Sequence, residues 1–427
     1  MNPKKIAFYG LFGQQNWGNE CTLQAIIYHV RRQYPDAELR CFCTDPEDTS
    51  RRHNIAAYPA SYCFTRGSRV KSSKKVNPVI NLLQKTFVRI PKELASWIEA
   101  YKSLQGFDML IVPGTGLLTD FSSNSLGIPY RLFKWSLAAK ACRCKLLFMS
   151  VGAGPMYQPL TRRLIKAALS LADYRSYRDS YSKQFVQGIG FKADGDPIYP
   201  DLAFSLPADL FPTCDQRDKK RTVIGVGVKD YCGVLGLPEH GGDEKYYRFI
   251  SKLDIFVTTL LERGYEVRLL IGDQLYDNKV KQDLMDLLQR RGVKPQEGQI
   301  TNEPIASVAE VLSQIAACDI VVSARFHNVL LALMLNKPAI SLSYHDKFAC
   351  LMAGVGLGSY CHDIDDLAVD ALAGQIVELE ANAATIKPRI RQKVEEYRIA
   401  LDGQYARVLQ SGQPAVLDQV LLPVAKG

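Results

Sequence analysis

Long apolar runs are missing from this chain. Of its 427 residues 47% are hydrophobic, yet no stretch reaches the roughly 18 uninterrupted apolar residues that cross a bilayer. The apolar part of the N-terminus, residues 6–10, is shorter than the core of a signal peptide. The sequence therefore predicts a cytoplasmic protein.

Cysteine spacing typical of a zinc site is missing as well. The eleven cysteines include two C-x-C pairs, Cys41/Cys43 and Cys142/Cys144, and neither has a second pair at zinc-finger spacing. In a reducing compartment we expect most of these thiols to be small, buried apolar groups. The sequence predicts no metal site and no cofactor.

Acidic residues are scarce from position 51 to position 102, where Glu93 and Glu99 are the only ones. Cations crowd the same segment: Arg51, Arg52, Arg66, Arg69, Lys71, Lys74, Lys75, Lys85, Arg89, Lys92 and Lys102. One interpretation is a solvated surface insertion. The other is a patch for anionic lipid headgroups or a lipid-linked pyrophosphate, which would hold the protein at the inner face of the membrane. Nucleic acid is not predicted as a partner, because no binding motif or interleaved aromatic pattern accompanies the charge.

Apolar strands alternate with helical patterns in both halves of the chain. The first half predicts strands at 5–9, 39–43, 109–112 and 146–151, and helices at 21–33, 91–104, 129–141 and 160–171. The second half predicts strands at 222–228, 266–271, 320–322 and 339–342, and helices at 246–263, 279–291, 305–317 and 328–335. Such alternation is typical of parallel, doubly wound α/β sheets.

The alternation divides into two domains. We predict an N-terminal Rossmann-like domain at 1–206, a linker at 207–221 and a C-terminal Rossmann-like domain at 222–367. Residues 368–427 would form a polar helical tail that packs back on the domains. Two Rossmann-like domains with parallel sheets facing each other across a cleft make a GT-B-like α/β fold.

The turn at 323–328 joins a predicted strand to a predicted helix. A helix N-terminus offers N–H groups and a dipole that favour an anion. Arg325 could bind a phosphate or carboxylate there bidentately, and His327 could give up a proton near neutral pH. This pairing predicts an enzyme that acts on a small anionic substrate.

Other polar residues follow the predicted strands of the second domain. Lys229 ends its first strand, and Ser343 and Lys347 follow the strand at 339–342. We interpret these three residues as further donor-binding groups, although a solvated turn would also explain Lys229. In the first domain, Asp179 is interpreted as the N-cap of a helix rather than as a catalytic group.

Small and polar residues follow two strands of the first domain. The glycine-rich loop at 10–20 lacks the G-x-G-x-x-G spacing of dinucleotide sites. The loop at 113–116 lies at another carboxyl edge, where open α/β sheets bind ligands. Ordinary turn glycines are one interpretation, and acceptor binding is the other. The predicted acceptor-binding residues are Asn16, Asn19, Glu20, Gly114, Thr115 and Gly116.

Several short motifs occur in a fixed order along the chain. They are Gly-Leu-Phe-Gly with Asn-Trp-Gly-Asn-Glu (10–20), Pro-Gly-Thr-Gly (113–116), Gly-Ala-Gly-Pro (152–155), Arg-Asp-Ser-Tyr-Ser (178–182), Asp-Leu-Ala-Phe (201–204), Ser-Ala-Arg-Phe-His (323–327) and Ser-Tyr-His-Asp-Lys (343–347). In this order they resemble the motifs of the polysaccharide pyruvyl transferase family.

The resemblance implies a GT-B-like fold and the transfer of pyruvate from phosphoenolpyruvate to sugar hydroxyls. The product would be a ketal on an exopolysaccharide, a cell-envelope glycan or a lipid-linked precursor. It also implies that Arg325 holds the anionic groups of the donor and that His327 protonates the enol methylene. The family usually has an acid where Asn19 stands, and often an arginine where Lys229 stands, so the bidentate fork is lost there.

Two other functions stay open. A GT-B glycosyltransferase that uses a nucleotide sugar would place the same Arg325 on a diphosphate. A non-enzymatic glycan-binding protein would keep the fold with a decayed site, and the intact pair of Arg325 and His327 argues against that decay.

Overall fold

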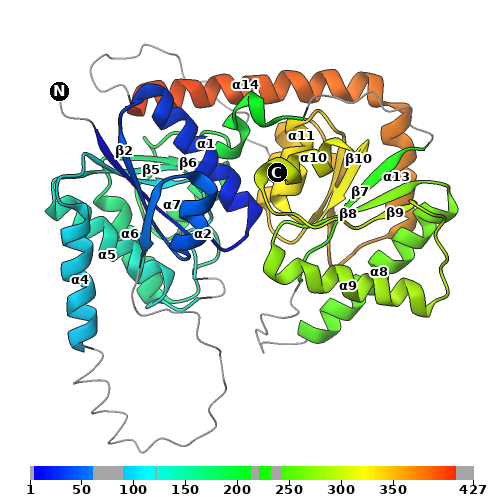
Figure 1. The fold of residues 1–427 in the computed structure, drawn as a ribbon, viewed down its shortest axis with the longest axis horizontal. Helices are drawn as coiled ribbons and strands as arrows, with labels where there is room; N and C mark the ends of the chain where they lie inside the picture. The colour runs from blue at the N-terminus through cyan, green and yellow to red at the C-terminus, as the bar shows by residue number, and fades with distance from the viewer. Residues whose placement is uncertain (1–3, 61–89, 121–122, 213–220, 232–241, 410–427) are drawn as a thin grey trace, which may run out of the picture.

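The structure, a computed structural model, describes residues 4–60, 90–120, 123–212, 221–231 and 242–409. An N-terminal and a C-terminal sheet form its framework (Figure 1). Within the described residues each sheet has six strands, and every strand pair is parallel.

The two sheets share one topology. The N-terminal strands are β1 (Lys5–Tyr9), β2 (Glu38–Cys43), β3 (Ala56–Pro59), β4 (Met109–Pro113), β5 (Lys145–Val151) and β6 (Tyr174–Tyr177). The C-terminal strands are β7 (Val223–Gly227), β8 (Glu266–Leu270), β9 (Ile300–Thr301), β10 (Ile320–Ser323), β11 (Ala339–Ser343) and β12 (Cys361–Asp363). Their orders are β3-β2-β1-β4-β5-β6 and β12-β11-β10-β7-β8-β9. Both are the doubly wound Rossmann order, so the predicted GT-B-like α/β fold is confirmed.

Helices connect the strands. The N-terminal helices are α1 (Trp17–Gln33), α2 (Pro46–His53), α4 (Ile90–Leu104), α5 (Ile128–Ala141), α6 (Pro159–Ser170) and α7 (Ser180–Gly188). The described residues also include the short 3-10 helices η2 (Leu202–Ser205), η3 (Ala208–Leu210) and η4 (Gly358–Tyr360). The remaining helices are α8 (Gly242–Glu262), α9 (Gln274–Arg290), α10 (Val308–Ala316), α11 (Phe326–Met334), α12 (Lys347–Gly354), α13 (Val369–Ala381) and α14 (Ala383–Leu409). None of the described helices is both long enough and apolar enough to cross a bilayer.

The central strands are buried along their whole length. Every residue of β4 and of β10 is buried, as expected for parallel strands covered by helices on both faces. Side chains of these strands form the hydrophobic core. Polar side chains that bind ligands or react are therefore expected in the loops at the carboxyl ends of the strands.

The eight predicted strands are confirmed to within one residue at each end. Among the described elements, the four short strands β3, β6, β9 and β12 and the helices α2 and α12 were not predicted. The start of α1 was placed wrongly, because the helix begins at Trp17 rather than at residue 21. Glycine is a poor helix former, and Gly18 made the first turn of this helix resemble a loop.

The two domains touch directly at the start of α1. The N–H of Trp17 donates to the carbonyl of Gly272 at 2.9 Å, and the N–H of Gln274 donates to the carbonyl of Gln15 at 3.0 Å. Far from this bridge, α14 runs along both domains (Figure 1). Its Arg398 donates to two backbone carbonyls at η2. The carboxyl ends of the two sheets are thereby held against each other.

Candidate active site

A buried ion pair fixes Arg325, the N-cap residue of α11. Its Nε donates to Oδ2 of Asp277 at 2.7 Å, and its Nη2 donates to Oδ1 of the same carboxylate. The Asp277 side chain is fully buried and also accepts the backbone N–H groups of Asp230, Gly272 and Asp273. Burial would lower the pKa of Arg325, but the charge of Asp277 raises it above its usual value. The guanidinium is thus permanently charged and held in one orientation.

His327 lies in the first turn of α11, between groups of the other domain. Its Nε2 is 3.7 Å from Oδ2 of Asp201, and this nitrogen is buried without a hydrogen-bond partner. Its Nδ1 faces Gly18 in the first turn of α1, where an added Cβ would lie only 1.9 Å from it. The imidazole therefore occupies a slot that exists because residue 18 has no side chain.

A second charged cluster comes from the N-terminal domain. Arg178 follows β6, and its guanidinium donates to Asp179 at 3.2 Å and to Asp201 at 3.3 Å. Burial would raise the pKa of Asp201, but His327 and Arg178 outweigh it and lower that pKa. Asp179 also caps α7 by accepting the N–H of Ser182 at 2.6 Å, so its predicted capping role is confirmed.

Two lysines lie among aromatic rings on the C-terminal side. The Nζ of Lys229 is 4.5 Å from the ring centre of Tyr344. The Nζ of Lys347 is 5.4 Å from the ring centres of both Tyr344 and Phe326. The Nζ of Lys229 also donates to the backbone carbonyl of Asp230 at 3.1 Å. Two ammonium groups among aromatic rings make this side of the site attractive to an anion.

Burial changes the proton affinity of both lysines. It lowers the pKa of Lys229. Burial and the nearby charge of Arg178 lower the pKa of Lys347 to about 7. An anion placed between these ammonium groups would favour their charged forms. Ser343 does not face them as a free hydroxyl, because its Oγ donates to the carbonyl of His345 at 3.1 Å and shapes the loop after β11.

The predicted acceptor residues at the start of α1 play structural roles in the described state. The side chain of Asn16 caps α1 and donates to Asp273 of the other domain at 3.3 Å. Asn19 donates to the carbonyl of Leu11 at 3.0 Å. Glu20 is fully buried between the N–H of Gly13 at 2.9 Å and His53 at 2.8 Å. Asn19 and Glu20 lie inside the helix, not in the loop that the sequence indicated.

The other predicted acceptor residues lie at the carboxyl end of β4. An added Cβ at Gly114 would meet Leu202 and Thr22 at 3.2 Å, so this glycine allows close packing. Gly116 has open space where its Cβ would be. The hydroxyl of Thr115 is buried and has no hydrogen-bond partner. A buried hydroxyl without a partner is unusual, and it keeps Thr115 a candidate for contacting a ligand.

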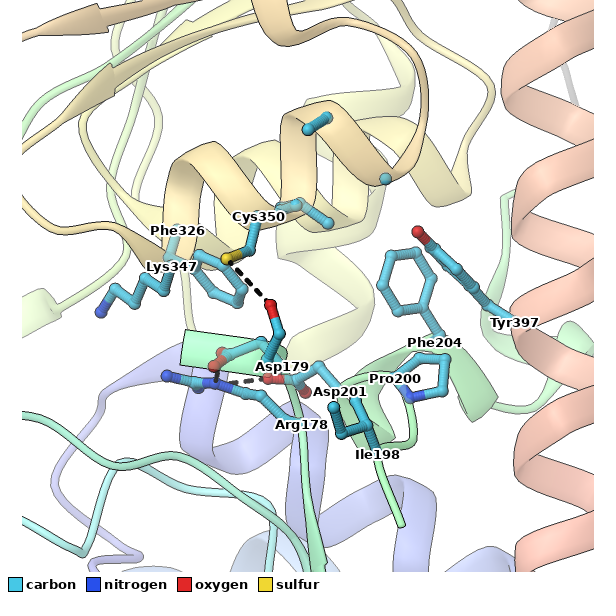
Figure 2. Close-up of a pocket in the computed structure, with 14 residues that line it drawn as sticks. Arg178, Asp179, Ile198, Pro200, Asp201, Phe204, Phe326, Lys347, Cys350 and Tyr397 are labelled. Carbon is cyan, nitrogen blue, oxygen red and sulfur yellow. Dashed lines mark hydrogen bonds and ion pairs between the residues drawn. The ribbon is translucent and has the colours of Figure 1, made fainter. Parts of the chain in front are cut away.

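A cavity of about 220 Å³ opens beside these charged groups. Figure 2 shows Arg178, Asp179 and Asp201 on one side and Lys347 on the other. Phe204, Pro200 and Tyr397 form its apolar end, next to α14. The cavity is smaller than the roughly 300–1,000 Å³ of sites for drug-sized ligands, so it suits a small molecule.

The sequence did not single out three charged residues of this site: Arg178, Asp201 and Asp277. Arg178 and Asp201 stand within the ordered motifs without an assigned role, and Asp277 lies outside those motifs. Their positions after β6 and at the starts of η2 and α9 were the available signal. Among the described residues, no three His, Cys, Asp or Glu side chains gather as a metal site would require.

The fold and the site define a two-domain, GT-B-like α/β protein with charged groups in the interdomain cleft. Residues 16–346 match the sequence profile of the polysaccharide pyruvyl transferases. The chain therefore belongs to the polysaccharide pyruvyl transferase family, as its motifs predicted. No curated protein matches its sequence.

Solved structures with the same fold are distant in sequence. HepE from Anabaena, solved with UDP-glucose, has a TM-score of 0.60 and 14% identity over 96% of this chain and 100% of that one. A UDP-GlcNAc 2-epimerase from Neisseria meningitidis, solved with UDP-GlcNAc, has a TM-score of 0.54 and 13% identity over 94% and 100%. A glycosyltransferase from Rickettsia africae has a TM-score of 0.57 and 12% identity over 96% and 100%. At such identities the likeness concerns the fold alone.

Proposed function

We propose that the protein transfers pyruvate from phosphoenolpyruvate to two hydroxyls of one sugar, forming a ketal. The acceptor would belong to an exopolysaccharide, a cell-envelope glycan or a lipid-linked precursor. The observation that supports this proposal is a group of three cations, Arg325, Lys229 and Lys347, in a member of the pyruvyl transferase family. His327 lies in the first turn of the helix that Arg325 caps. The donor has a phosphate and a carboxylate, and several cations can bind both groups.

His327 supplies the proton in this proposal. Its Nε2 lies 3.7 Å from Oδ2 of Asp201, and this carboxylate would stabilise the protonated imidazole before the transfer. Protonation turns the methylene carbon of the donor into a methyl group and leaves the neighbouring carbon electron-poor. A sugar hydroxyl attacks that carbon, phosphate leaves, and a second hydroxyl closes the ring. One hydroxyl proton restores His327 and the other leaves with phosphate, so the scheme needs no further cofactor and no metal.

The acceptor would approach from the N-terminal domain. The carboxyl end of β4 offers Thr115, whose hydroxyl has no partner, and Gly116, which leaves open space beside it. Asn16, Asn19 and Glu20 would act mainly by fixing the start of α1 against the other domain. This assignment keeps donor and acceptor on opposite walls of the cleft.

The direct test is phosphate release from phosphoenolpyruvate in the presence of candidate aryl or lipid-linked glycosides. Phosphate that appears only when the acceptor is present supports pyruvyl transfer. Release of nucleotide from UDP-glucose or UDP-GlcNAc, without any response to phosphoenolpyruvate, would instead favour a nucleotide-sugar glycosyltransferase.

Gly18 provides the first prediction. Gly18→Ala places a methyl group against the His327 imidazole, so the ring must move. The helix itself is not weakened, because alanine has a higher helix propensity than glycine. We expect kcat to fall by up to about 100-fold, as for a displaced catalytic group, and the free energy of unfolding to fall by about 1–3 kcal/mol, as for an overpacked buried site. The control is Gly374→Ala, because Gly374 lies in α13 with nothing within 4 Å of its added Cβ. Unchanged kcat in Gly18→Ala would contradict the proposed role of this slot.

Lys347 provides a prediction about pH. Its pKa of about 7 means that the ammonium is charged below pH 7 and neutral above it. Affinity for phosphoenolpyruvate should therefore fall between pH 7 and 9, by at most about tenfold per pH unit for the loss of one proton. Lys347→Arg should bind with a flatter profile, because an arginine stays charged over this range. Calorimetric titrations at several pH values would measure both, and identical profiles would exclude Lys347 from the donor site.

A further inference from the structure

The helix α4 exposes an apolar stripe. Leu94 is 60% exposed, Ile98 is 56% exposed and Tyr101 is also exposed. Spacings of four and three residues place all three on one side of the helix. Large apolar side chains that are exposed in line along a helix are a sign of an interaction surface.

The opposite side of α4 is firmly packed on α5. Trp97 donates from Nε1 to the hydroxyl of Tyr130 at 2.7 Å, and Lys134 donates to Ser96 at 2.7 Å. The helix therefore has its own buried face, and the stripe of Leu94, Ile98 and Tyr101 is additional to it.

Charge on the exposed side of α4 is positive. Lys92 and Lys102 are exposed near the two ends of the helix, whereas its acids, Glu93 and Glu99, are only partly exposed. Glu93 is moreover engaged by Tyr130 and Lys134 of α5. Most of the basic segment noted in the sequence, residues 61–89, lies outside the described residues. The surface thus fits a partner that is both apolar and anionic.

The position of α4 also suits a partner near the acceptor. Contacts from residue 93 to residue 130 and from residue 97 to residue 133 show that α4 and α5 run in the same direction. Because α5 begins after the carboxyl end of β4, the first turns of α4 lie on the cleft side of the sheet. In Figure 1 this helix lies at the end of the molecule away from the C-terminal sheet.

We propose that α4 docks the protein on an anionic lipid surface, with Leu94 and Ile98 inserted at the headgroup boundary and the lysines facing the lipid charge. An interfacial helix of this kind combines an apolar face with flanking cations. Docking there would hold the N-terminal domain at the membrane that carries a lipid-linked acceptor, a consequence that rests on the proposed function. The docking itself does not depend on the chemistry.

The test is cosedimentation of the full chain with two kinds of vesicle, pure phosphatidylcholine and phosphatidylcholine with 30% phosphatidylglycerol, about 30% being enough for a strongly negative surface. We expect binding to the anionic vesicles only. Leu94→Glu combined with Ile98→Glu should weaken it at least tenfold. The matched control is Ile255→Glu, which changes a similarly exposed isoleucine on α8 in the other domain and should bind like the original protein.

Salt and oligomeric state separate the remaining outcomes. Part of the binding should survive high salt, because the apolar contact is not screened. Equal binding by the Leu94/Ile98 variant, or complete loss of binding in salt, would overturn insertion of the stripe. Absence of vesicle binding together with a dimer that the same variant dissociates would assign the stripe to a second copy of this chain. Phosphate release with a soluble glycoside tests the proposed function separately from all these results.

Discussion

His327→Gln should reduce phosphate release by about 10²–10⁴-fold, the usual contribution of a positioned general acid. Glutamine keeps a polar side chain of similar length but has no proton to give to the methylene carbon. The cations that would bind the donor are unchanged, so the Kd for phosphoenolpyruvate should change little. Stopped assays of phosphate at saturating donor, with calorimetric titration of the donor, measure the two quantities separately.

His362→Gln is the matched control for this substitution. His362 lies in the edge strand β12 and interacts with Gln375 at 2.7 Å, away from the cleft residues. Its replacement should leave kcat within about twofold, as for most substitutions outside a site. Full activity of His327→Gln would remove the histidine from the reaction, and equal losses in both variants would point to a general effect on the fold.

The architecture could be predicted from sequence because it depends on local patterns. Apolar β-branched runs alternate with helical periodicity, and parallel topology follows from that alternation. The four described strands that escaped prediction lack the pattern. β3 is four residues long and contains Pro59, and β6 contains the polar residues Arg175 and Ser176. β9 and β12 are only two and three residues long. All four lie at sheet edges, where the demand for apolar residues is weaker.

The site could be predicted only in part, because its electrostatics are tertiary. Arg325 and His327 were found from a local rule, a strand-to-helix turn that favours anions. Their acidic partners, Asp277 and Asp201, are distant in the chain, and no local pattern connects them with that turn. The role of Gly18 was likewise hidden, because only the closed arrangement of the two domains brings it against His327.

Asp277 connects several elements around the proposed donor site. Its carboxylate is fully buried and accepts three backbone N–H bonds as well as the fork of Arg325. Two of those N–H groups belong to Gly272 and Asp273, in the segment that touches the start of α1. The same acid therefore orients the guanidinium that is proposed to bind the donor and shapes the loop that contacts the N-terminal domain.

Asp277→Asn should lower the free energy of unfolding by about 3–5 kcal/mol, the usual effect of removing one partner of a buried ion pair. The amide keeps the size of the side chain but leaves the buried charge of Arg325 without compensation. Glu396→Gln is the control, because its pair with Lys393 at 2.6 Å is partly exposed and should contribute no more than about 1 kcal/mol. Urea denaturation of both variants measures the difference.

The affinity of Asp277→Asn for phosphoenolpyruvate should also fall, since the guanidinium loses its fixed orientation. A stable Asp277→Asn protein with unchanged donor affinity would mean that Arg325 is positioned by its helix alone.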